Sequence, residues 1–129
     1  MRIDYNLIQE VLTRIANEAD GFSRNSVRRN DFPDGEEGDK NFYQVAYHYK
    51  VLCENGFVSG KVIESASNEG NYPVAVMWTG LTLSGQKILE AMENDTLWTK
   101  IKGNLSSVGV ESLKQIPAFA IEILKGGIL

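Results

Sequence analysis

The sequence predicts a single α+β domain made of amphipathic helices and a short β-hairpin. Its 129 residues suit one folded core, since domains commonly hold about 100–150 residues. Hydrophobic residues make up 43% of the chain, which is ordinary for a globular protein. Apolar residues recur at three- and four-residue spacing in several segments, and two strand-like segments flank a polar turn.

The first helix is predicted from Asp4 to Ala19, with Asp4 as its cap and Gly21 as its stop. Residues 22–32 predict an exposed edge strand, because they combine polar residues with a β-branched valine. Pro33–Gly38 predict a loop, since proline fixes φ and glycine permits positive φ. The apolar face of the helix consists of Leu7, Ile8, Val11, Leu12, Ile15 and Ala19.

A second helix is predicted from Asp39 to Asn55, and Gly56 is its expected stop. Phe57–Ser65 and Pro73–Thr79 then predict two strands, joined across the polar residues 67–71. These two strands form the expected β-hairpin. The apolar stripe of the helix consists of Phe42, Val45, Ala46, Tyr49, Leu52 and Cys53.

Three further helical patterns follow the hairpin. They cover Leu81–Met92 with Thr82 as a cap, a segment that starts at Asp95, and Val110–Lys125. We therefore expect a domain over residues 1–94 and a helical extension, packed on it, over residues 95–129. The last helix is apolar along two stripes, the first of which consists of Val110, Leu113, Pro117, Ala120 and Leu124.

This order of elements predicts the fold class more closely. Helix, strand, helix, β-hairpin and helix is the layout of a winged helix-turn-helix domain with a two-stranded wing. One departure is evident, because residues 19–39 read as strand and loop where that layout has another full helix. Fold analogy alone is a weak reason to expect DNA binding.

Two segments strengthen the winged-helix interpretation. His48–Val58 resembles the end of the recognition helix in metal-sensor-type bacterial repressors, and Leu81–Leu89 resembles the element that follows the wing in many such regulators. Over nearly its whole length the chain resembles a family of small bacterial and prophage proteins that share a domain of unknown function. The matching residues are Asp4, Leu7, Ile8, Tyr47, His48, Leu52, Gly56, Leu81, Thr82, Gly85, Leu89, Asp95, Thr96 and Trp98. The chain departs from the pattern at Ile3, Asn55 and Phe57, and the resemblance implies a fold without an activity.

Composition limits the environment and the partners. The single cysteine, Cys53, cannot form an internal disulfide, which favours a reducing compartment. The sequence holds no apolar run of the roughly 18–20 residues that a membrane span needs and no signal-peptide pattern at its start, so we expect a cytoplasmic protein. The net charge of −4 repels phosphate, so any nucleic-acid site must be a local patch.

The sequence holds little catalytic chemistry. It has one histidine and one cysteine, and no metal-ligand cluster, nucleophile elbow or Gly-rich phosphate loop. His48 and Cys53 lie five residues apart on one predicted helix, so their side chains point about 140° apart. We therefore expect no enzyme, no catalytic residue, no metal and no cofactor.

The leading hypothesis is a homodimeric DNA-binding regulator whose 39–55 helix enters the major groove of double-stranded DNA. Its candidate DNA contacts are Arg24, Arg28, Arg29, Lys40, Tyr43, Gln44, Tyr47, His48 and Lys61. Two alternatives stay open: His48 holds its helix against a neighbouring strand, and the arginines pair with the acidic residues of the loop that follows them.

A second hypothesis is a protein-interaction module of phage or mobile-element origin with the same fold. The predicted wing tip favours it slightly, because the tip carries Glu69 and no basic residue. For assembly, the second apolar stripe of the last helix predicts a homodimer interface at Ile116, Phe119 and Ile123. The alternative for this stripe is packing within the same chain.

Overall fold

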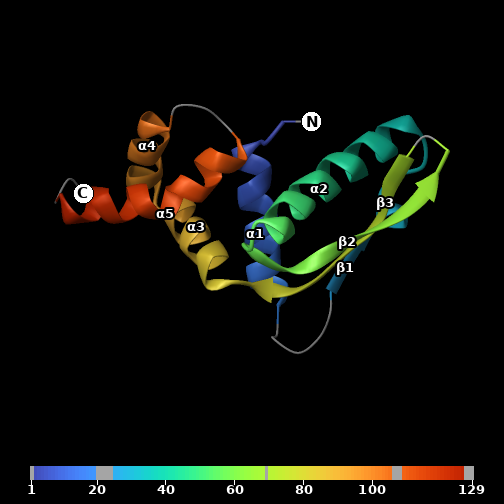
Figure 1. The fold of residues 1–129 in the computed structure, drawn as a ribbon, viewed down its shortest axis with the longest axis horizontal. Coiled ribbons are helices and arrows are strands. Elements are labelled where there is room, and N and C mark those ends of the chain that lie inside the picture. Colours follow the sequence, from blue (N-terminus) through green and yellow to red (C-terminus); the bar gives the residue numbers. More distant parts are fainter. Residues whose placement is uncertain (1, 20–24, 69, 106–108, 127–129) are drawn as a thin grey trace.

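The computed structural model describes residues 2–19, 25–68, 70–105 and 109–126. Within these ranges the fold is α+β, with five α-helices and a three-stranded antiparallel sheet. Three helices gather at one end of the molecule, the sheet and one long helix lie at the other, and the first helix lies between them (Figure 1). The elements are α1 (Tyr5–Glu18), β1 (Asn25–Arg28), η1 (Arg29–Asp31), α2 (Glu36–Glu54), β2 (Val58–Ser67), β3 (Gly70–Leu81), α3 (Leu83–Glu93), α4 (Asp95–Asn104) and α5 (Val110–Lys125).

Helix α1 begins as the sequence predicts. A carboxylate oxygen of Asp4 accepts hydrogen bonds from the backbone N–H groups of Asn6 at 2.9 Å and Leu7 at 3.3 Å. These bonds satisfy two donors that have no partner inside the helix, so the predicted cap is confirmed. The predicted stop, Gly21, lies outside the described residues. The buried face of α1 consists of Ile8, Val11, Leu12 and Ile15.

The segment before α2 differs in part from the prediction. An edge strand is present as β1, but the loop expected over residues 33–38 is wrong in its second half, because α2 already begins at Glu36. Three carboxylates in the first turn of α2 favour this early start, since the amino end of a helix attracts negative charge. Gly38 also allows it, because a Cβ there would overlap the carbonyl oxygen of Pro33.

The predicted β-hairpin is confirmed, and both of its strands are longer than expected. The central strand β3 pairs with β1 on one side and β2 on the other. Val27, Val76 and Val62 form one row across the sheet, and Val27 and Val76 are buried in the core. Because side chains alternate between faces along a strand, the rows on either side of this one point away from the core.

The junction between α2, the hairpin and α3 is built around Thr82. Its hydroxyl donates to the carbonyl of Gly56 at 2.6 Å and accepts from the N–H of Gly85 at 3.2 Å, so Thr82 caps α3 as predicted. Gly56 has φ of +79°, the left-handed conformation that commonly ends a helix. At Gly85, a Cβ would overlap the carbonyl oxygen of Phe57. The Leu-Thr-x-x-Gly pattern thus has a structural role, because it connects the start of α3 to the end of α2 and to the hairpin.

Helix α5 spans the predicted residues, but its orientation differs from the prediction. Ile116 and Ile123 are buried in the same core as α1, and Phe119 packs against that core. The stripe assigned to a dimer interface is therefore part of the protein's own interior, because α3 and α4 cover it. The large apolar side chains of α5 that stay exposed are Ile121 at 48% and Leu124 at 56%, and the sequence had placed Leu124 in the core.

Candidate interaction surface

One face of the sheet carries apolar side chains that do not belong to the core. Two rows of paired residues make up this outer face: Ser26, Met77 and Lys61 in one row, and Arg28, Ala75 and Ile63 in the next. Ile63 and Met77 lie outside the hydrophobic core; Ile63 is 36% exposed, Met77 is half-buried, and Ala75 between them is 9% exposed. A hollow of about 410 Å³ lies over this face, lined in part by Arg28, Ile63 and Met77.

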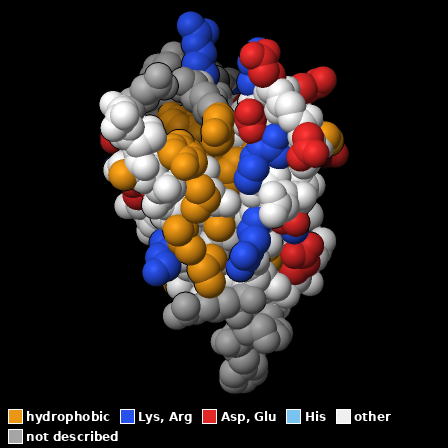
Figure 2. Space-filling model, turned by 90° about the vertical axis from the view of Figure 1, so that its right-hand side faces the viewer, with side chains coloured by type: hydrophobic (Ala, Val, Ile, Leu, Met, Phe, Trp, Pro, Cys, Tyr) orange, Lys and Arg blue, Asp and Glu red, His pale blue; other side chains and the backbone are white. Residues whose placement is uncertain are grey.

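Basic side chains border this apolar strip. Figure 2 shows hydrophobic side chains in a continuous stripe, with Lys and Arg side chains on both sides and acidic side chains gathered beyond one of them. By strand register, Arg28 stands on the β1 margin of the outer face and Lys61 on the β2 margin. The outer face is therefore locally basic on a chain of net charge −4.

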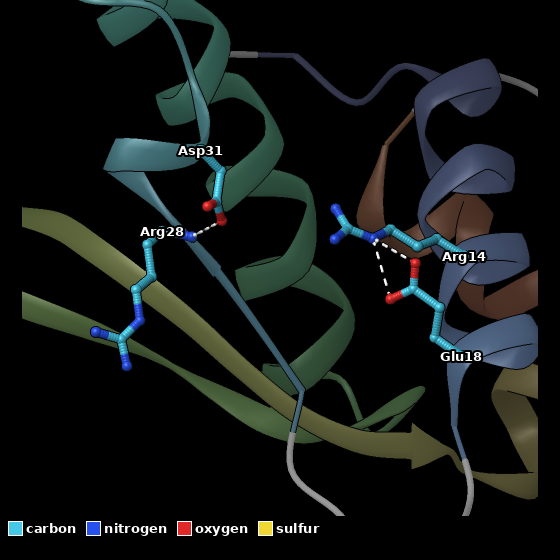
Figure 3. A network of polar contacts seen from close by, with 4 residues as sticks. All are labelled: Arg14, Glu18, Arg28 and Asp31. Carbon is cyan, nitrogen blue, oxygen red and sulfur yellow. Dashed lines mark hydrogen bonds and ion pairs between the residues drawn. The ribbon is translucent and has the colours of Figure 1, made fainter.

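The backbone of Arg28 is fixed by a hydrogen bond, whereas its side chain has no hydrogen-bond or ion-pair partner within the described residues. Its N–H donates to a carboxylate oxygen of Asp31 at 2.8 Å, while its guanidinium extends away from Asp31 (Figure 3). Arg14 on α1 contrasts with it, because its guanidinium pairs with Glu18 at 3.2 Å. Within the described residues, no hydrogen bond or ion pair engages the guanidinium of Arg28 or the ammonium of Lys61.

The predicted DNA-contact residues of α2 lie on the other side of the sheet. Lys40 and Gln44 are exposed, whereas Tyr43 and Tyr47 are half-buried and line a groove of about 300 Å³ between α2 and the hairpin. Lys50 pairs with Glu64 across that groove at 3.4 Å. The structure thus separates the predicted residues of α2 from Arg28, whereas Lys61 also lines a hollow of about 190 Å³ beside Lys50, Cys53 and Glu54 of α2. Arg24 lies outside the described residues.

His48 was a candidate for DNA contact, and the structure corrects this prediction. Its side chain is fully buried, with 0% exposure. Nε2 accepts the N–H of Asp4 at 2.9 Å, and Nδ1 lies 2.7 Å from the carbonyl oxygen of Gln44. The imidazole therefore ties α2 to the start of α1, and it is unavailable to a ligand.

Arg29 is likewise unavailable as a phosphate contact. It forms an ion pair with Asp39 and donates to the carbonyl oxygens of Phe32 at 3.2 Å and Gly35 at 3.3 Å. Asp39, in the first turn of α2, therefore neutralises Arg29, as the alternative interpretation held for the acidic residues that follow the arginines. The guanidinium fixes the turn between η1 and α2.

The described residues offer little for metal or thiol chemistry. They contain no group of three or more His, Cys, Asp or Glu side chains that could hold a metal ion. Burial raises the pKa of the Cys53 thiol to about 11, which keeps it protonated and poorly nucleophilic at neutral pH. No helix in the described ranges is long and apolar enough to cross a membrane.

The outer face was missed in the sequence, although a signal for it exists. Val74–Trp78 is a run of five apolar residues inside a strand. A strand covered on one face only would alternate apolar and polar residues, so a continuous run indicates apolar side chains on both faces. Of the residues of this face, the sequence predicts only Arg28 and Lys61, at its margins, as candidate contacts.

Comparisons with known proteins identify a family. The chain is 26% identical over 120 residues to an uncharacterized protein of Haemophilus influenzae, and the match covers 90% of this chain and 92% of that protein. No solved structure matches the chain. The family model described as "Hypothetical protein (DUF2513)" matches residues 2–111. Because that match takes in most of the chain, the protein belongs to the DUF2513 family.

Proposed function

We propose that this protein is a non-enzymatic protein-interaction module of the winged-helix type. The observation that carries the proposal is the apolar outer face of the sheet, which stands apart from the core. Exposed apolar surface is costly in water, and contiguous patches of it commonly mark protein-binding sites. Ile63 and Met77 form the centre of this binding surface, with the nearly buried Ala75 between them.

The winged-helix assignment rests on topology. Helix α1, strand β1, helix α2 and the β2–β3 hairpin follow one another in the winged-helix order, and β1 pairs with the second strand of the hairpin. Only the short η1 stands between β1 and α2, where a helix-turn-helix has a further helix. A protein-binding role does not need that missing element, whereas groove-reading DNA binders use it to cross the backbone.

The charges of α2 weigh against DNA as the principal ligand. Its first turn carries Glu36, Glu37 and Asp39, and this is the end that a recognition helix directs toward base edges. Carboxylates there repel phosphates. His48 and Arg29, two of the expected contacts, are already engaged inside the protein.

DNA binding stays a second candidate because one observation favours it. Lys40 and Gln44 are both exposed on α2 at a spacing of four residues, which places them on the same side of that helix. In this second proposal they would contact DNA, and a column of nonspecific DNA run across a salt series tests it. Retention that falls steeply with salt supports it, because phosphate contacts release counterions.

Photocrosslinking tests the principal proposal directly. A photoreactive amino acid replaces Ile63 on the outer face, and in a matched variant it replaces Gln86 on the exposed side of α3. Both variants are irradiated in cells that naturally express the chain. We expect discrete protein adducts from position 63 and none from position 86. Adducts with DNA, or equal adducts from both positions, would contradict a protein-binding role for the outer face.

A further inference from the structure

We propose that the outer face of the sheet binds an amphipathic helix with acidic margins, supplied by a partner protein. This inference rests on the proposed function and names the class of its partner. The apolar side of the partner helix packs on Ile63, Ala75 and Met77, and its carboxylates meet Arg28 and Lys61 at the two margins. A helix is the occupant that gives this three-stranded sheet a cover on its second face.

The spacing of the two basic residues suits a helix. Arg28 pairs with Ala75, Ala75 with Ile63, and Lys61 lies two residues from Ile63 along β2. Arg28 and Lys61 are thus two strands apart and offset by one row, which separates their Cα atoms by about 12 Å. An α-helix with its side chains is about 10–12 Å wide. A helix lying on the apolar strip therefore has one basic side chain on either side.

The positive charges at the two margins favour a partner whose facing groups are negatively charged. Arg28 and Lys61 are exposed, and within the described residues no hydrogen bond or ion pair engages the guanidinium of Arg28 or the ammonium of Lys61. Acidic groups of a partner can pair with them without breaking an existing contact. Opposite charges around an apolar centre steer association and reject partners of the wrong sign.

The apolar centre excludes a purely electrostatic ligand. Phosphate groups laid over Ile63 and Met77 would lose water without gaining hydrogen bonds, which is costly. The centre therefore favours a ligand that has its own apolar strip, as an amphipathic helix does. Nucleic acid at this face is thereby an alternative that the experiment must eliminate.

Two synthetic peptides test the inference. Both are about 20 residues long, enough to populate a helix, with leucine along one side. The first carries glutamate at the margins of the leucine strip and the second carries lysine. Each is titrated into chain labelled at its methyl groups, and the resonances of Ile63, Ala75 and Met77 are followed by NMR. We expect the glutamate peptide to shift these resonances and the lysine peptide to leave them unchanged.

Charge reversal supplies the matched control. Arg28→Glu combined with Lys61→Glu should lower the affinity of the chain for the glutamate peptide by about tenfold or more. The same double variant should allow the lysine peptide to bind. Lys87→Glu changes another exposed lysine, on α3 and outside this face, and should leave binding unchanged. Retained folding of each variant is checked by its unshifted core methyl resonances.

The possible failures are distinguishable. Equal binding of both peptides, or binding of neither while position 63 still forms protein adducts, overturns the acidic-helix partner and leaves the proposed function intact. Shifts of the same methyl groups by a DNA duplex, with no effect of either peptide, overturn both. Loss of binding in Lys87→Glu to the same extent as in the double variant also overturns the inference, because charge at the outer face would not be the cause.

Discussion

The imidazole of His48 joins α2 to the amino end of α1 by accepting the backbone N–H of Asp4 at 2.9 Å. The carbonyl of Gln44 can only accept, so Nδ1 carries the ring proton and Nε2 is left as the acceptor. A neutral imidazole satisfies both of these backbone groups. Two residues 44 positions apart in sequence are thereby joined by one part-buried hydrogen bond.

Replacing His48 by phenylalanine should lower the free energy of unfolding by about 1–3 kcal/mol, because it removes two part-buried hydrogen bonds, to the N–H of Asp4 and the carbonyl of Gln44, while keeping the ring volume. Urea denaturation measures the change. Gln44→Ala is the matched control: only the backbone carbonyl of Gln44 is used, so its free energy of unfolding should stay within about 0.5 kcal/mol of the parent. A His48→Phe variant as stable as the parent would show that these bonds are dispensable.

Glycine-to-alanine changes at two helical positions should have opposite effects. At Gly85 a Cβ overlaps the carbonyl of Phe57, so Gly85→Ala must push α3 away from the hairpin and should cost about 1–3 kcal/mol. At Gly103 on α4 a Cβ meets no atom within 4 Å, so Gly103→Ala should gain up to about 0.5 kcal/mol from helix propensity. Thermal melts of the pair check the signs, and a stabilising Gly85→Ala would contradict the close contact.

These contacts explain which features the sequence could predict. Helix α5 and the capped start of α1 follow from local spacing and a local cap, and both were predicted. The start of α2 was not, because a Pro-Asp-Gly segment reads as a turn and the contact of Gly38 with the Pro33 carbonyl is visible only in three dimensions.

The candidate site was harder to predict, because its contacts also join residues whose proximity is visible only in three dimensions. The partner of His48 is distant in sequence, and spacing on one helix cannot reveal it. Whether Arg29 meets Asp39 depends on the path of the intervening loop. The apolar outer face did leave a local trace in the run Val74–Trp78, so this part of the surface was within reach of sequence reasoning.

Cys53 should react slowly with alkylating reagents. Burial raises the pKa of its thiol from 9.0 to about 11, and the thiolate is the reactive form. At pH 8 this shift of two pKa units makes the thiolate about 100-fold scarcer than in the unfolded chain. Iodoacetamide labelling followed by mass spectrometry compares the native protein with the urea-unfolded protein. Equal labelling rates would rule out a protected thiol.

The same shift predicts a loss of stability at alkaline pH. The folded state holds the thiol proton more tightly than the unfolded state, so the contribution of Cys53 is complete below about pH 9 and is lost as the pH rises through about 11. Cys53→Ala should flatten the pH dependence of the free energy of unfolding in this window. Tyr49, whose pKa burial raises to about 12, should retain its part of the alkaline loss in that variant.

A charge introduced into α5 should distinguish interior from surface. Ile123 is 6% exposed within the core, so Ile123→Lys buries an ammonium without a partner and should cost more than about 3 kcal/mol. Ile121 is 48% exposed, and Ile121→Lys should change the free energy of unfolding by less than about 0.5 kcal/mol. Circular dichroism melts and light scattering measure stability and oligomeric state together. If Ile123→Lys instead gave a fully stable monomer from a dimeric parent, this stripe would be an interface after all, and the packing of α5 against α3 and α4 would be wrong.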